Sequence, residues 1–128
     1  MSRSGYSDDC ENAALWRSAV RRATTGYRGQ HFLKRLRAAL DAMPIRRLIT
    51  DQIKNEQGEV CALGALDPTA PYEDAEGLAK HFGIARALAA EIVYENDEYG
   101  WWRFSERETP DRRWIRMRAW VDNQILPD

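Results

Sequence analysis

The sequence lacks any long run of apolar residues and contains little cysteine, histidine or lysine. In its 128 residues, no apolar stretch approaches the roughly 20 residues that a membrane-spanning helix requires. The first residues, 1–6, are polar and lack the apolar segment of a secretion signal. These absences argue against a membrane protein and a secreted precursor, so we expect a cytoplasmic protein with no membrane partner.

Only two cysteines, Cys10 and Cys61, and two histidines, His31 and His81, are present. Without a secretion signal, free thiols are expected rather than a disulfide. The four residues contain none of the close ligand pairs of zinc sites, so we predict no metal and no cofactor. A nucleophilic Cys61 would need a nearby base or cation, and both histidines are distant in sequence. Cys61 is therefore interpreted as a core residue, and a cysteine-dependent enzyme is kept as the second alternative.

Charge is distributed unevenly along a chain of ordinary globular composition. Hydrophobic residues make up 44% and charged residues 30%, which fits one domain over residues 10–128 after a flexible tail over 1–9. The formal net charge is −1, but residues 1–57 carry +5, residues 58–100 carry −7 and residues 101–128 carry +1. This distribution predicts separate basic and acidic faces.

Apolar residues at helical spacing predict an all-α fold, a compact bundle of five to seven short helices. The expected helices cover residues 10–24, 30–43, 44–55, 73–82, 84–96 and 110–125. The third begins at Pro44, which suits the first turn of a helix. The last begins at Thr109 and Pro110, a capping hydroxyl followed by proline. A short extended segment is expected near residues 101–104.

The centre of the fold is predicted in residues 58–66, Gly-Glu-Val-Cys-Ala-Leu-Gly-Ala-Leu. As a helix, this run places Cys61, Gly64 and Ala65 on one side, where a neighbouring backbone can approach closely. As a strand, it has two apolar faces. Both interpretations fit so short a run, and the absence of other strand candidates favours the helix. Cys61 and Gly64 are therefore predicted to form the structural centre.

Residues 78–92 resemble a helix-turn-helix, with Ala79 at the close helix crossing, Gly83 in the turn and Ile84 pointing inward. The second helix, however, carries mostly acidic residues after Arg86, and these would repel phosphates. A structural helical hairpin is favoured, and a DNA-binding regulator is the first alternative function. The Arg-rich first helices offer a basic patch, but the sequence pI near 6.1 makes direct nucleic-acid binding the less favoured mode.

An acidic and an aromatic cluster follow the central run. The candidate partner-binding acids are Glu73, Asp74, Glu76, Glu91, Glu95, Asp97 and Glu98. Two interpretations stay open: these acids pair internally with the Arg-rich helices, or they dock a basic protein. The candidate aromatic residues are Tyr99, Trp101 and Trp102. Core packing and an exposed interface anchor are both considered for them.

Three short motifs carry a resemblance. Residues 58–66, then 96–98 (Asn-Asp-Glu), then 109–114 (Thr-Pro-x-x-Arg-Trp) resemble a loose set of small proteins of phages, prophages and bacterial genomes. The resemblance spans roughly residues 27–125, and the Trp101–Trp102 pair and the basic first helix depart from the pattern. It implies a phage or mobile-element setting but no activity.

These observations together favour a non-enzymatic protein that binds another macromolecule. In the implied setting, the expected role is an inhibitor of a host defence complex, of the anti-CRISPR type. Its acidic and aromatic surface would dock a basic protein surface, for example on a complex that handles nucleic acid, and charge pairing would set the orientation.

Overall fold

Six α-helices make up most of this computed structural model, which describes residues 3–5, 13–98 and 108–127. The helices are α1 (Ala13–Thr25), α2 (Tyr27–Asp41), α3 (Ala62–Leu66), α4 (Ala75–Phe82), α5 (Arg86–Asp97) and α6 (Pro110–Gln124). Among the described residues, β-type pairing is limited to an isolated antiparallel bridge between Lys54 and Val60. The predicted all-α fold with five to seven helices is confirmed, whereas residues 101–104 lie outside the described part.

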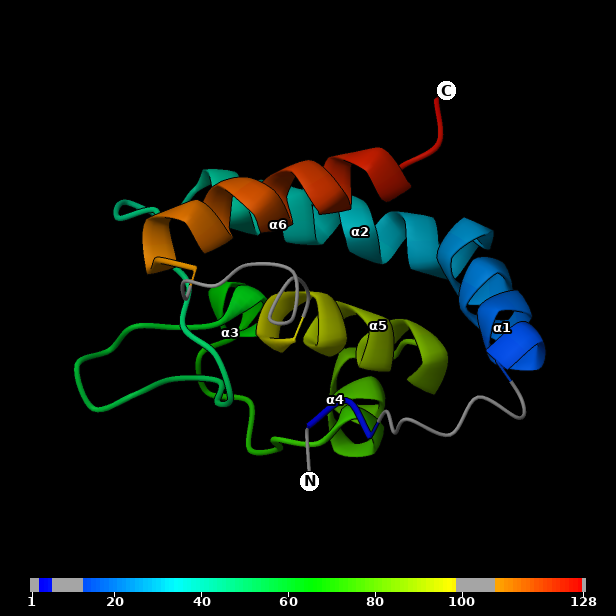
Figure 1. Cartoon of the computed structure of the whole chain (residues 1–128), viewed down its shortest axis with the longest axis horizontal. Helices are drawn as coiled ribbons and strands as arrows, with labels where there is room; N and C mark the ends of the chain where they lie inside the picture. The colour runs from blue at the N-terminus through cyan, green and yellow to red at the C-terminus, as the bar shows by residue number, and fades with distance from the viewer. Residues whose placement is uncertain (1–2, 6–12, 99–107, 128) are drawn as a thin grey trace.

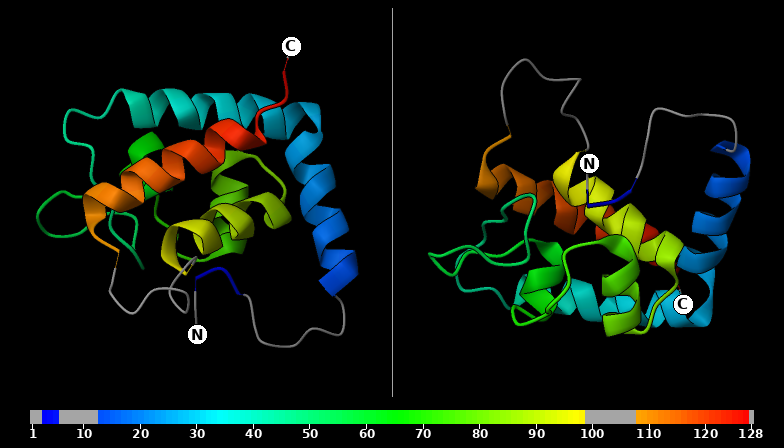
Figure 2. Two further views of the ribbon diagram at one scale, coloured as in Figure 1. Left: turned by 45° about the horizontal axis from the view of Figure 1, so that its top comes forward. Right: turned by 90° about the horizontal axis from the view of Figure 1, so that it is seen from below.

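The helices form two levels joined by α1. The long helices α2 and α6 pack against each other and run in opposite directions, while α3, α4 and α5 lie beneath them (Figure 1). At one end of the molecule, α1 turns away from α2 and reaches α5, as the two views of Figure 2 also show. The central element is α5, because it contacts α1, α3, α4 and α6.

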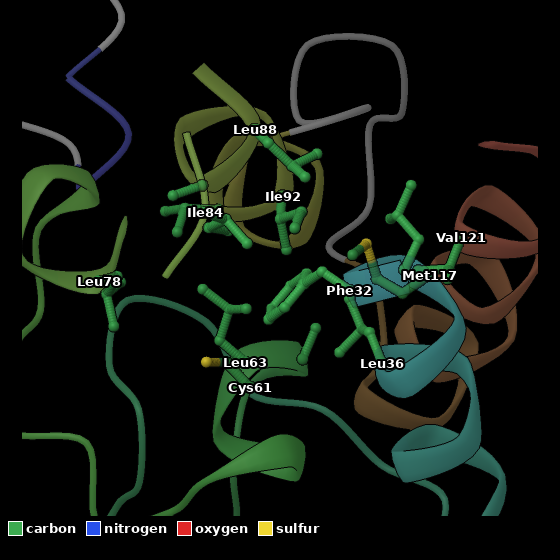
Figure 3. Packing of buried hydrophobic residues seen from close by; sticks show 14 of the residues in the cluster. Phe32, Leu36, Cys61, Leu63, Leu78, Ile84, Leu88, Ile92, Met117 and Val121 are labelled. Atoms are coloured by element: carbon green, nitrogen blue, oxygen red, sulfur yellow. The ribbon is translucent and has the colours of Figure 1, made fainter. Parts of the chain in front are cut away.

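The core lies between α2, α5 and α6. The inner face of α2 contributes Phe32 and Leu36, and these meet Ile92 of α5 and Met117 of α6 (Figure 3). Leu63 of α3 closes one side of this cluster. Burying such a side chain stabilises the fold by about 1.5–3 kcal/mol relative to leaving it exposed. The long apolar faces of α2 and α5 therefore provide much of the stability.

The predicted helix over residues 44–55 is wrong, because this segment belongs to an irregular loop over residues 43–61. Its backbone bonds to distant partners instead of making helical bonds. The N–H of Leu48 donates to the Pro110 carbonyl at 3.0 Å, and the N–H of Ile49 donates to the Val60 carbonyl at 2.9 Å. Leu48 and Ile53 of this loop are buried, whereas Ile45 is exposed. Non-local hydrogen bonds have overridden a helical spacing of apolar residues.

The central run combines both conformations that its sequence allows. Val60 is extended and pairs with Lys54, and Cys61 then caps the helix α3 by accepting the N–H of Gly64 at 3.4 Å. Gly64 itself lies against the backbone of Ile53, where a Cβ atom would collide with the carbonyl oxygen. The predicted close approach of a neighbouring backbone is thus found at Gly64.

We predict that Gly64→Ala lowers the free energy of unfolding by about 2 kcal/mol, since the added methyl group must displace the Ile53 backbone. Urea unfolding followed by circular dichroism measures the change. The matched control is Ala38→Ser, which also adds one heavy atom but on the exposed side of α2, and should cost less than about 0.7 kcal/mol. Equal effects of the two substitutions would contradict this interpretation of Gly64.

Candidate functional site

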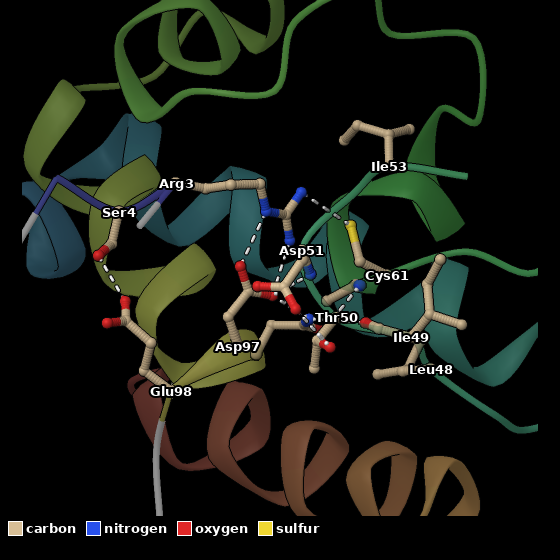
Figure 4. Close-up of polar contacts among 12 residues, drawn as sticks. Arg3, Ser4, Leu48, Ile49, Thr50, Asp51, Ile53, Cys61, Asp97 and Glu98 are labelled. Carbon is tan, nitrogen blue, oxygen red and sulfur yellow. Dashed lines mark hydrogen bonds and ion pairs between the residues drawn. The ribbon is translucent and has the colours of Figure 1, made fainter. Parts of the chain in front are cut away.

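A buried ion pair joins the N-terminal residues to the end of α5. Two guanidinium nitrogens of Arg3, Nε and Nη2, donate to the two carboxylate oxygens of Asp97 at 2.8 and 2.7 Å (Figure 4). Only 9% of the Arg3 side chain and 2% of the Asp97 side chain are exposed. Next to this pair, the hydroxyl of Ser4 donates to the Glu98 carboxylate at 2.6 Å. The part of the predicted flexible tail that the structure describes is therefore anchored; the rest of that tail lies outside the described residues.

Asp97 also organises the backbone of the 43–61 loop. Its Oδ1 atom accepts the backbone N–H of Asp51 at 3.1 Å and the side-chain amide of Asn96 at 2.8 Å. Asp51 has a positive φ of 70°, which is uncommon for a residue other than glycine. The hydrogen bond from the Asp51 N–H to the buried Asp97 carboxylate stabilises this strained conformation.

Asn96 connects the same cluster to α3. Its Oδ1 atom accepts the backbone N–H of Ala62 at 3.0 Å, and its Nδ2 atom donates to the Ile49 carbonyl at 2.9 Å. The motif over residues 58–66 and the motif over 96–98 thus meet through direct hydrogen bonds. We refer to Arg3, Asn96 and Asp97, with the loop and α3 backbone that they bind, as the Asp97 cluster.

The third motif also has a structural role. The Thr109 hydroxyl caps α6 by accepting the N–H of Arg112, as predicted. One guanidinium nitrogen of Arg113 donates to the Leu48 carbonyl at 2.8 Å, and the indole N–H of Trp114 donates to the Leu40 carbonyl at 3.2 Å. All three motifs of the resemblance therefore hold the loop and the helices together.

Cys61 lies within the Asp97 cluster but is not placed for nucleophilic chemistry. The residue is 1% exposed, and this burial raises the pKa of its thiol, although the charge of Arg3 partly opposes the shift. An Arg3 nitrogen lies 3.8 Å from the sulfur. The two histidines lie elsewhere, His31 stacked on Tyr27 and His81 paired with Asp67. The geometry gives the cysteine-dependent enzyme no support.

The predicted acidic surface is largely engaged within the molecule. Glu95 is buried 3.7 Å from Arg116, and Asp97 is buried against Arg3. Asp74 caps α4 by accepting the N–H of Gly77. Of the two interpretations left open, internal pairing fits these residues. The arginine partners are Arg3 for Asp97 and Arg116 for Glu95, however, and not the Arg residues of the first two helices.

The remaining candidate residues have mixed positions. Glu73 accepts the N–H of Ile53 at 3.1 Å but keeps an exposed side chain. Glu76 is exposed beside Lys80, and Glu98 binds Ser4. Glu91 is half-buried and lines a groove beside α1. The aromatic candidates, Tyr99, Trp101 and Trp102, lie outside the described residues.

The helix-turn-helix resemblance reflects a real hairpin with a buried second helix. Gly83 ends α4 in the left-handed conformation that the turn requires, with φ 70°, and Ile84 is buried as predicted. Seven of the twelve residues of α5 are buried. Since a recognition helix needs an exposed polar face to enter a groove of DNA, the burial of most of α5 gives this use of the helix little support.

A group of exposed cations lies on α1 and α2, and we refer to it as the basic face. Residues 12–40 contain seven Lys or Arg and no Asp or Glu. The basic face consists of the exposed residues Arg17, Arg21, Arg28, His31, Lys34 and Arg35. Tyr27, 89% exposed, stacks on His31 at its centre. These cations can be found in the sequence, but the overall pI gives no sign that they are concentrated on α1 and α2, apart from the acidic residues.

A hydrogen-bonded pair of Asp67 and His81 borders the basic face. The Nε2 atom of His81 lies 2.7 Å from an Asp67 carboxylate oxygen, and both residues line a hollow of about 300 Å³ with Arg35. The hydroxyl of Thr69 donates to the same carboxylate at 2.6 Å. This hydroxyl, followed by His81, lowers the pKa of Asp67 to about 2.

Three comparisons, with protein-family models, with curated proteins and with solved structures, find no match to this chain. Within the described residues, no helix is long and apolar enough to cross a bilayer, and no group of three potential metal ligands is gathered.

We predict that removing Arg3 destabilises the fold far more than removing an exposed arginine. Arg3→Gln leaves the buried Asp97 carboxylate without its charged partner and should lower the free energy of unfolding by about 3 kcal/mol. The control Arg118→Gln breaks the bidentate but more exposed pair with Asp41 and should cost less than about 1 kcal/mol. Urea unfolding compares the two; a larger loss for Arg118→Gln would refute the central role of Asp97.

We predict that Asp67 titrates at about pH 2 and that Thr69→Val raises its pKa toward the ordinary value of 3.8. Because the folded-state pKa lies below the unfolded value, the stability linked to Asp67 is present above about pH 4 and is lost as the pH falls toward 2. A carbon-13 NMR titration of the carboxyl group measures both values. An ordinary pKa in the unsubstituted protein would contradict the hydrogen-bond geometry.

Proposed function

We propose that this chain is a non-enzymatic binding protein that contacts a nucleic acid through the basic face of α1 and α2. The observation that carries the proposal is the absence of any acidic residue from residues 12–40, although seven cations occur there. In the described part of the chain, no ion pair involves Arg17, Arg21, Arg28 or Arg35. These cations are therefore available to phosphates.

The internal ion pairs explain how an overall acidic chain keeps a basic binding surface. Buried Asp97 is compensated by Arg3, and buried Glu95 shares Arg116 with Glu108, so these two acids add less to the field outside than exposed acids do. Local charge, rather than the net charge of −1, then governs attraction of a polyanion. Arginine suits this task because its planar guanidinium binds phosphate oxygens in pairs.

Tyr27 supports a nucleic acid over other polyanions. Its ring is almost fully exposed and lies parallel to the His31 imidazole, with ring centroids 6.4 Å apart. An exposed aromatic ring among cations costs solvation free energy unless a partner covers it, and nucleic-acid bases are flat partners for such rings. The alternation of Arg, Lys, Tyr and His on one helix face is thus suited to both phosphate and base.

We predict that the double substitution Arg28→Glu/Arg35→Glu lowers affinity for a nucleic acid at least tenfold, because it reverses two phosphate contacts. Fluorescence anisotropy with a labelled oligonucleotide at about 50 mM salt measures the affinity, which should fall at least tenfold again at about 200 mM salt.

The matched control is Lys54→Glu/Arg112→Glu, which makes the same charge change at exposed positions that do not belong to α1 or α2. It should alter affinity less than about threefold, a small change compared with the loss of specific phosphate contacts. No binding at low salt would refute the proposed function, and equal losses for the two double variants would refute the assignment to the basic face.

A second candidate function is the predicted inhibitor of a host defence complex, docking through acidic and aromatic residues. Tyr72, 45% exposed, is close in sequence to Glu73 and Glu76, whose side chains are 56% and 65% exposed, and this observation favours a small docking patch at the start of α4. The mobile-element setting comes from the sequence resemblance alone. In an inhibition assay with a purified defence nuclease, Tyr72→Ser/Glu76→Lys should abolish inhibition; retained inhibition would refute this candidate.

A further inference from the structure

A groove beside the basic face has the chemistry of a site for one nucleic-acid base. It has a volume of about 320 Å³ and lies between α1 and the C-terminal end of α6. Its lining includes the aromatic ring of Trp16, the cations Arg17 and Arg21, the carboxylate of Glu91, and the amides of Asn123 and Gln124. We call it the α1–α6 groove.

The charged residues that line the groove favour a phosphate at its rim and an uncharged base in its inner part. Arg17 and Arg21 are exposed, so they stand at the rim, whereas Glu91 is half-buried. A phosphate is attracted to the rim and repelled by the carboxylate, which leaves the inner part to an uncharged group. The groove is thus suited to a nucleotide that points its base inward and its phosphate outward.

Trp16 and the two amides offer the contacts that a base uses. Trp16 is partly exposed along the groove, and stacking on such a ring is available to every base because each has a flat π-face. Asn123 and Gln124 each carry an amide donor and acceptor that can bind the edge of a base. These contacts require an unpaired base, since a base within a duplex is already stacked and hydrogen-bonded.

Gln30 holds the walls of the groove together. Its Nε2 atom donates to the carbonyls of Thr24 and Gln124 at 2.7 and 2.9 Å, and its Oε1 atom accepts the N–H of Leu126 at 2.7 Å. A single side chain therefore links α1 to the end of α6. Because this link exists without any ligand, the groove does not have to be ordered at the time of binding.

We propose that the α1–α6 groove binds one unpaired base of a single-stranded nucleic acid, while Arg17 and Arg21 bind the flanking phosphates. This inference rests on the proposed function and makes it more specific, because a basic face alone would bind single strands and duplexes without such a distinction. The chain should therefore prefer single strands.

The test measures affinity for an oligothymidine of about 12 nucleotides, which is long enough for one base and its flanking phosphates, and for a duplex of the same length at equal salt. The unsubstituted protein should bind the single strand about tenfold more tightly. Trp16→Leu should remove about tenfold from single-strand affinity and leave duplex affinity unchanged, whereas Trp16→Phe should keep most of the stacking and most of the affinity.

A second variant covers the case in which Trp16→Leu does not fold, as judged by circular dichroism. Asn123 is exposed, so Asn123→Leu should fold normally and lower single-strand affinity about threefold without affecting the duplex. Equal affinity for single strand and duplex, or equal losses for both in either folded variant, would refute base binding in the α1–α6 groove. Such a result would not contradict nucleic-acid binding by the basic face. Binding to neither nucleic acid would overturn the proposed function itself.

Discussion

The Asp97 carboxylate is the group around which the described structure is arranged, because a buried charge must be compensated on every side. Arg3 supplies the opposite charge, and the Asn96 amide and the Asp51 N–H supply further hydrogen bonds. These donors come from the N-terminal residues, the 43–61 loop and α5. Satisfying one carboxylate therefore fixes how three separate parts of the chain lie relative to one another.

In this arrangement, the acidic residues of α5 and the basic residues of α1 and α2 have different roles. The acids near the end of α5 serve the interior, where Glu95 and Asp97 meet Arg116 and Arg3. The cations of α1 and α2 have no acidic neighbours along residues 12–40 and remain on the surface. The molecule thus gains a basic face although its net charge is −1. The proposed nucleic-acid binding follows from this division of roles.

Sequence reasoning succeeded where local signals decide the structure and failed where distant partners do. Thr109 and Pro110 located the start of α6, because a cap depends on neighbouring residues. The spacing of apolar residues over 44–55 suggested a helix, but their backbone bonds to Val60 and Pro110. Likewise, the acidic character of Asp97 suggested a surface residue, since Arg3, 94 positions away, gives no local sign of pairing with it. Burial of charge was therefore the part that sequence could not reveal.

An NMR titration with a single-stranded oligonucleotide tests the division of roles most directly, because it reports on every assigned backbone amide at once. We expect shifts that concentrate in residues 14–35 and 123–126, with little change at Glu95 and Asp97. Shifts that concentrate in residues 72–76 or 95–98, or no shifts at low salt, would contradict it.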